Sequence, residues 1–168
     1  MASTLRPQTR KTLVSGTVAG LLSLAALAVL GRRELSCAAA PVNAPSHWVW
    51  GDDALTQRRW SWRYSGLGIV IHQASSVWWA WLHHRRHPSP HGPLHDAVVT
   101  TAAAAVVDLA LTPKRFTPGF ERHLSPLGLA LVYGAFAVGL AIACKGSPAA
   151  SSTPVRTRRP HRPARPPA

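Results

Sequence analysis

Cysteine and recognisable catalytic motifs are both scarce in this sequence, and their scarcity excludes several kinds of site. The chain of 168 residues has two cysteines, Cys37 and Cys144, and neither belongs to a CxxC motif or lies among histidines at metal-ligand spacing. We therefore expect no disulfide framework, no metal site and no cofactor. The chain also lacks the GxSxG, HExxH, Walker A and GxGxxG motifs. No enzyme class is indicated, and we expect a non-enzymatic protein.

Acidic residues are also few. Six Asp and Glu stand against 19 Lys and Arg, which gives a net charge of +13. Such a charge can indicate nucleic-acid binding, but here the basic residues lie outside the apolar stretches. In a membrane protein, flanking Lys and Arg set topology and contact anionic lipid headgroups. The expected partners are therefore the lipid bilayer and its anionic headgroups, and not nucleic acid.

Four apolar stretches occupy much of the chain, at residues 12–31, 65–82, 97–112 and 126–144. The first has no charge and no amphipathic break, and its length matches the roughly 20 residues that cross a bilayer core of about 30 Å. The expected fold class is all-α. We predict an integral membrane four-helix bundle over residues 12–145, preceded by a basic, disordered lead at 1–11.

The first stretch also has features of a cleaved signal peptide, with basic residues before it and small residues at 38–40 after it. However, it exceeds the roughly 7–15 apolar residues of a signal peptide, and Arg32 and Arg33 precede any cleavage site. We therefore expect a retained membrane span. Its GxxxG pattern, Gly16 to Gly20, permits close packing against another helix.

The segment after the first stretch, residues 32–64, is rich in tryptophan and arginine. Both residue types favour the headgroup zone, so we expect short interfacial helices at 47–50 and 54–63 in this first outer loop. The C-terminal segment 146–168 is rich in Pro, Ser and Arg and has no aromatic residue. That composition predicts a disordered tail.

The distribution of basic residues gives a weak topology signal. With both termini inside, eleven Lys and Arg fall on the inner side and eight on the outer side. The excess favours a multi-pass membrane protein with its N- and C-termini inside. A homo-oligomer stays open as an alternative.

Two ionisable side chains lie within the apolar stretches, His72 and Asp108. Ionisable groups in hydrocarbon are costly, and they usually have a partner and often a function. His72 lies about 10 Å, and Asp108 about 7–8 Å, from the same face of the membrane at 1.5 Å per residue. We therefore expect them to share one space between helices and to pair. Ser75 and Ser76 extend this polar group by one helical turn.

A second polar group belongs to the outer loops. Asn43, Ser46 and His47 precede the second stretch, and Glu121 follows the third. These loops open on the face toward which His72 and Asp108 lie. We expect this outer-loop polar group to approach the intramembrane one.

Three interpretations of the intramembrane group stay open. It is a hydrogen-bonded pair that fixes helix packing, or a proton- or ion-handling site, since a carboxylate raises the pKa of a neighbouring histidine. The third, a metal or haem site with His47 as second ligand, has too few histidines at membrane depth.

We expect a non-enzymatic protein with a structural or stress-related role. The alternative is a small proton- or ion-handling transporter or channel component.

Histidines recur every four residues after the second stretch, at His83, His87, His91 and His95. On one helix this spacing would form a metal-binding face. Pro88, Pro90 and Pro93 interrupt any such helix. We expect a solvated basic loop, with a weak metal site as the alternative.

Three segments resemble a family of small uncharacterised bacterial inner-membrane proteins with four predicted helices. They are residues 41–51 (PVNAPSHWVWG), residues 72–80 (HQASSVWWA), and Asp108 together with residues 112–121 (TPKRFTPGFE). The resemblance covers roughly residues 12–144. It implies the four-span architecture and no activity.

Overall fold

The computed structural model describes residues 7–86 and 88–145, and within them every regular element is helical, with no strand. Long helices account for most of this part: α1 Pro7–Leu35, α5 Leu67–Arg85, α6 Pro93–Val106 and α7 Pro126–Lys145. Shorter helical segments connect them: α2 Ala39–Asn43, η1 Ala44–Ser46, α3 His47–Trp50, α4 Asp53–Thr56, η2 Trp62–Gly66, η3 Val107–Leu111 and η4 Phe120–Arg122. Residues 7–11, expected in a disordered lead, belong to α1. The predicted tail, 146–168, lies outside the described residues.

Three helical segments are long and apolar enough to cross a membrane: Pro7–Leu35, Pro93–Leu111 and Pro126–Ala143. Large apolar side chains on their outer faces are exposed, among them Leu21, Val106, Leu127 and Ile142. An exposed apolar surface of this kind suits contact with lipid. The helix α5 has 19 residues, but His72, Gln73 and its serines lower its hydropathy, and it is not among the three.

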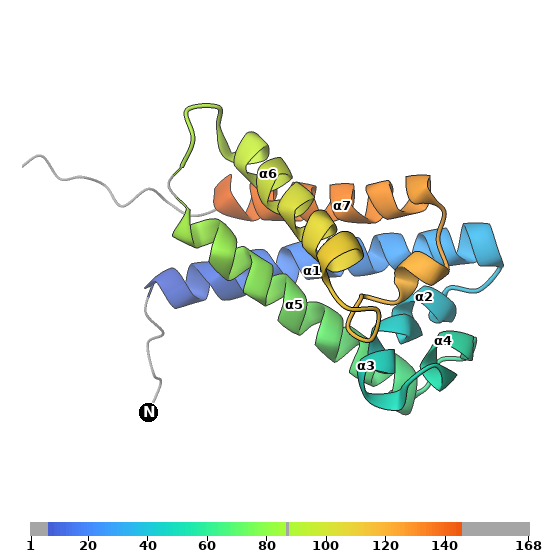
Figure 1. Cartoon of the computed structure of the whole chain (residues 1–168). Coiled ribbons are helices and arrows are strands. Elements are labelled where there is room, and N and C mark those ends of the chain that lie inside the picture. The colour runs from blue at the N-terminus through green and yellow to red at the C-terminus, as the bar shows by residue number, and fades with distance from the viewer. Residues whose placement is uncertain (1–6, 87, 146–168) are drawn as a thin grey trace, which may run out of the picture.

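The helix α1 lies between α5 and α7, as Figure 1 shows, and packs more extensively against these two than any other pair of elements does. Small residues permit the close approach. A Cβ added to Gly16 would lie 2.6 Å from the Cα of Val77 on α5, and one added to Gly20 would overlap the side chain of Gln73. The GxxxG pattern therefore serves packing within the chain, as its sequence suggested.

On the opposite side of α1, Gly139 of α7 meets Ala19 so closely that a Cβ at position 139 would overlap the Ala19 backbone. The helix α6 packs on α7 and has far fewer neighbours on α5. Residues of both α5 and α6 line the cavity that holds the candidate site.

The segment after α1 differs from the expected one. The helix α1 ends at Leu35, where Ser36 takes a left-handed conformation with φ 55°, and Pro41 lies inside α2. The helix α3 agrees with the prediction of 47–50. The predicted helix at 54–63 is wrong, because α4 ends at Thr56 and the chain is non-helical until η2 begins at Trp62.

Asn43 holds this segment together. Its side chain is fully buried, and its Nδ2 donates to the carbonyl oxygens of Gln57 and Arg59, each at 3.1 Å. Its Oδ1 accepts from the hydroxyl of Ser65 at 2.6 Å. The Asn43 amide therefore provides hydrogen-bond donors to two carbonyl groups of the non-helical segment that replaces the predicted helix. Through Ser65 it also links this segment to η2, directly before α5.

The close contact between α1 and α7 predicts different outcomes for two glycines of the same helix. Gly139→Ala should destabilise the fold by about 1–3 kcal/mol, because the new methyl group overlaps the Ala19 backbone. Gly134→Ala is the control, since its Cβ would meet nothing within 4 Å, and alanine favours helix by up to about 1 kcal/mol. Thermal unfolding followed by circular dichroism in detergent measures both. Equal effects of the two substitutions would contradict the packing described for α1.

Candidate functional site

Asp108 lies in η3, a π-helical turn that continues α6 to Leu111. The wider turn closes through Thr112, whose backbone N–H and hydroxyl both donate to the carbonyl of Val107 at 2.8 Å. Single π-helical turns at the end of α-helices are frequent at functional sites. Here the turn places Asp108 and Thr112 on the lining of the same cavity.

The carboxylate of Asp108 has a partner on the neighbouring helix. The phenol of Tyr133, on α7, donates to Oδ2 of Asp108 at 3.1 Å. A hydrogen bond to a charged acceptor is stronger than one between neutral groups. Glu121 lies near enough to act on both side chains electrostatically, which makes this end of the cavity negative.

His72, on α5, has its partner on α1. Its Nε2 lies 2.9 Å from the hydroxyl oxygen of Ser23 on α1. The Ser23 hydroxyl donates to the carbonyls of Ala19 and Gly20, one turn back along α1. We therefore assign a proton to Nε2 of His72, which donates to the hydroxyl oxygen of Ser23. In this neutral tautomer, Nδ1 is an acceptor.

Both polar pairs line one cavity of about 270 Å³, formed by α1, α5, α6, α7 and the segment between α6 and α7. Aromatic rings form much of its wall: Trp48, Trp78, Trp79, Phe116, Phe120, Tyr133 and Phe136. Trp78 and Phe116 are 54% and 51% exposed, so the cavity reaches the surface there. The site is therefore an aromatic cavity with two separate polar positions.

The expected direct pair of His72 and Asp108 is not formed in the described part of the chain. Each side chain has a nearer partner, and the Phe120 ring lies 6.5 Å from the His72 ring and 6.3 Å from the Tyr133 ring. An aromatic side chain of η4 therefore links the two polar pairs. The two residues do share one space between helices, because both line the cavity.

The serines of the predicted polar stripe also lie here. Ser75 and Ser76 both line the cavity. The hydroxyl of Ser76 donates to the backbone carbonyl of His72 at 2.8 Å, one turn back along α5. The Ser76 hydroxyl is therefore already hydrogen-bonded within α5, whereas Ser75 contributes a small side chain to the cavity wall.

The predicted outer-loop polar group does not line the cavity. Asn43 and Ser46 are fully buried and serve the fold, and Ser46 donates to the Asn43 carbonyl at 2.7 Å. His47 is 2% exposed, its Nδ1 lies 2.8 Å from the Ala44 carbonyl, and its Nε2 has no hydrogen-bond partner. Pro45 and Trp48, the neighbours of these residues in the sequence, reach the cavity wall instead.

Glu121 and His123 form a half-buried polar layer beside the cavity. Each has one buried atom without a hydrogen-bond partner, Oε2 of Glu121 and Nε2 of His123. Burial lowers the pKa of His123, the positive charge of Arg58 lowers it further, and Glu121 opposes this effect. His123 is therefore neutral near pH 7 and adds no positive charge to this side of the site.

Sequence reasoning did not single out Ser23 or Tyr133, the partners of the two ionisable residues. The signal for Tyr133 was available, since it is one of two tyrosines in the chain and lies in an otherwise apolar stretch. Ser23 gave no signal, because a serine in a membrane helix usually bonds to its own helix backbone. Its second role depends on the approach of α5 to α1.

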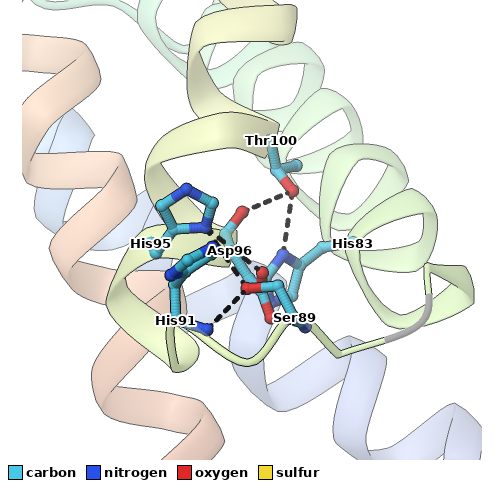
Figure 2. A network of polar contacts seen from close by, with 6 residues as sticks. All are labelled: His83, Ser89, His91, His95, Asp96 and Thr100. Atoms are coloured by element: carbon cyan, nitrogen blue, oxygen red, sulfur yellow. Dashed lines mark hydrogen bonds and ion pairs between the residues drawn. The ribbon is translucent and has the colours of Figure 1, made fainter.

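A second polar cluster lies at the opposite end of α5 and α6 (Figure 2). His83 contacts the Thr100 hydroxyl at 2.9 Å, and Asp96 accepts from the Ser89 backbone N–H at 3.0 Å. The proline-rich segment does interrupt the helix here, since α5 ends at Arg85 and α6 begins at Pro93. His87 lies outside the described residues.

This cluster borders a cavity of about 260 Å³. Across residues 7–86 and 88–145, no group of three or more His, Cys, Asp or Glu side chains is arranged to hold a metal. The polar contacts in Figure 2 close the loop between α5 and α6, with Ser89 bonded to Asp96 and close to His95. We therefore place the candidate site in the larger aromatic cavity.

The bond between Tyr133 and Asp108 predicts a stability difference between the two tyrosines of the chain. Tyr133→Phe removes the donor to a half-buried carboxylate and should cost about 1–3 kcal/mol. Tyr64→Phe removes the other hydroxyl, which lies outside the cavity, and should change stability by less than about 0.5 kcal/mol. Thermal unfolding in detergent measures both. A Tyr133→Phe protein as stable as the wild type would show that the bond is not formed in solution.

The chain matches no protein-family model, no curated protein and no solved structure. Its function is therefore argued from the geometry of this cavity.

Proposed function

We propose that this chain is a non-enzymatic, multi-pass membrane protein that binds a small amphipathic molecule in the aromatic cavity between α5 and α6. One observation carries the proposal. Two polar pairs, Ser23 with His72 and Tyr133 with Asp108, line the same apolar cavity from opposite sides. Apolar walls with a few placed polar groups are typical of small-molecule sites.

We propose α5 as the fourth span. Its 19 residues suffice for a bilayer core, and it packs along α1, which is apolar enough to cross a membrane. Its polar side chains His72, Ser75 and Ser76 line the cavity. The arrangement agrees with the resemblance to four-span bacterial proteins, and we keep the inner (plasma) membrane with both termini inside as part of the proposal.

The segment before α5 supports an interfacial position. Trp62 is 94% exposed, and the guanidinium of Arg63 lies 4.4 Å from the centre of the Trp50 ring. Exposed tryptophan and arginine suit the headgroup zone, where the ring contacts acyl chains and the charge contacts anionic lipid. A homo-oligomer is compatible with this surface, and its test is the mass of the protein in detergent.

A purely structural role accounts less well for the cavity. Polar residues that fix helix packing usually bond to each other across the interface, and membrane helices pack closely around them. His72 and Asp108 each bond across a helix interface in this way, but both also line a space with Trp79 and Phe136 that close helix packing does not explain. Binding of a molecule in that space accounts for both the separation and the aromatic wall.

Proton or ion handling is the second candidate, because His72 and Asp108 border the same space. No hydrogen bond joins them within residues 7–86 and 88–145, so a relay would need water or a ligand between them. Proton flux in liposomes tests this role. Flux that His72→Asn and Asp108→Asn both abolish, in proteins that stay folded, supports it, and a wild-type protein without flux excludes it.

Filling the cavity should abolish binding. Three soluble probes with a phenyl ring on a two-carbon chain are suitable: 2-phenylethylammonium, 2-phenylethanol and 3-phenylpropionate. We expect at least one to bind the wild-type protein in nanodiscs, measured by saturation-transfer NMR with protein-free nanodiscs subtracted. Ser75→Phe should abolish this binding, because the new ring occupies the cavity.

The control is Ala74→Phe, at the next position on α5, where the side chain is exposed and does not line the cavity. It adds the same ring outside the site and should leave binding unchanged. If none of the three probes binds the wild-type protein, or if both variants bind like the wild type, the cavity is not a binding site.

A further inference from the structure

We propose that the molecule bound in the cavity is an organic cation, a protonated amine carried on a small apolar body. This inference rests on the proposed binding function and names its ligand class. It starts from charge. The chain carries a net charge of +13, yet among residues 7–86 and 88–145 neither Lys nor Arg lines the cavity. Within the same residues Asp108 is the one carboxylate on the wall, so the lining carries negative charge in a strongly basic protein.

Two residues that line the cavity, His72 and Asp108, each offer an acceptor atom to a ligand. Tyr133 donates to Oδ2 of Asp108, and Oδ1 has no hydrogen-bond donor among the described residues. Nδ1 of His72 is an acceptor because Nε2 carries the proton toward Ser23. An ammonium group has three donors and no acceptor, so it complements both positions.

The aromatic wall favours the same charge. The faces of Trp, Tyr and Phe rings are negative and attract cations, with Trp the most effective. Trp48, Trp78 and Trp79 all line the cavity, together with Phe120 beside His72 and Tyr133. A positive ligand between these rings gains cation–π attraction in addition to apolar contact.

An anionic ligand is disfavoured by the same groups. It would face the Asp108 carboxylate at close range, and Glu121 adds a second negative charge nearby. Burial lowers the pKa of His123, which lies close enough to Glu121 to interact with it, and so favours its neutral form near pH 7. No positive group of the wall compensates this repulsion.

The volume sets the size of the apolar body. At about 270 Å³, the cavity lies at the lower end of the roughly 300–1,000 Å³ typical of ligand sites. It suits a body of one or two rings and not a full acyl chain. The ligand class is therefore a compact aromatic or alicyclic amine.

The test compares the affinities of a cationic, a neutral and an anionic probe with the same phenylethyl body in the wild-type protein. We expect 2-phenylethylammonium to bind at least about tenfold more tightly than neutral 2-phenylethanol, from cation–π attraction and the carboxylate. We expect 3-phenylpropionate to bind most weakly. This comparison uses the full chain in nanodiscs at pH 7.5 and needs no variant, so it holds even where a variant fails to fold.

Asp108→Asn should then reduce the preference for the cation, because the carboxylate is lost while the aromatic wall stays. Asp96→Asn is the matched control, since it removes one carboxylate from the same helix at the far end, outside the cavity, and it should retain the tenfold preference.

The outcomes separate the two proposals. If 2-phenylethanol binds as tightly as 2-phenylethylammonium, or the anion binds most tightly, the cation inference is overturned and the binding function stands. If Asp108→Asn in a folded protein leaves the tenfold preference undiminished, the carboxylate does not select the charge and the inference is again overturned. If no probe binds, both proposals fail together.

Discussion

The close approach of α1 to both α5 and α7 is the constraint on which the rest of the structure depends. Gly16 and Gly20 let α5 approach one face of α1, and the contact of Gly139 with Ala19 brings α7 against another. Because α6 packs on α7 and little on α5, the helices α5 and α6 separate. Ser23 can reach His72 only across the α1–α5 contact, and Tyr133 reaches Asp108 only across the α6–α7 contact. The cavity and its polar groups therefore follow from small-residue packing.

Much of this architecture was predictable, because long apolar stretches carry a strong signal in membrane proteins. The stretches at 12–31, 97–112 and 126–144 correspond to the helical segments that can cross a membrane. The region around Asn43 was not predictable, because its helices are too short for periodicity to reveal. Their ends depend on a buried amide that bonds to the carbonyls of Gln57 and Arg59, far along the chain.

The candidate site was predictable in part. Counting residues along the spans placed His72 and Asp108 at a similar depth, and both line one cavity. Counting gives depth and not orientation about the helix axis, so it could not reveal that each side chain faces a different neighbour. The π-helical turn at Asp108 further rotates that residue relative to a regular helix. The sequence therefore predicted a direct pair of His72 and Asp108. The structure instead has two separate pairs, and the Phe120 ring lies close to His72 in one and to Tyr133 in the other.

The proposed binding depends on the aromatic cavity that has the Asp108 carboxylate on its wall. The most direct measurement is an experimental structure of the protein prepared with 2-phenylethylammonium. We expect the ammonium nitrogen within about 3 Å of the Asp108 carboxylate, with the phenyl ring among Trp78, Trp79 and Phe136. A structure in which α5 and α6 close together and side chains fill this space, or in which the amine binds elsewhere, would contradict the account.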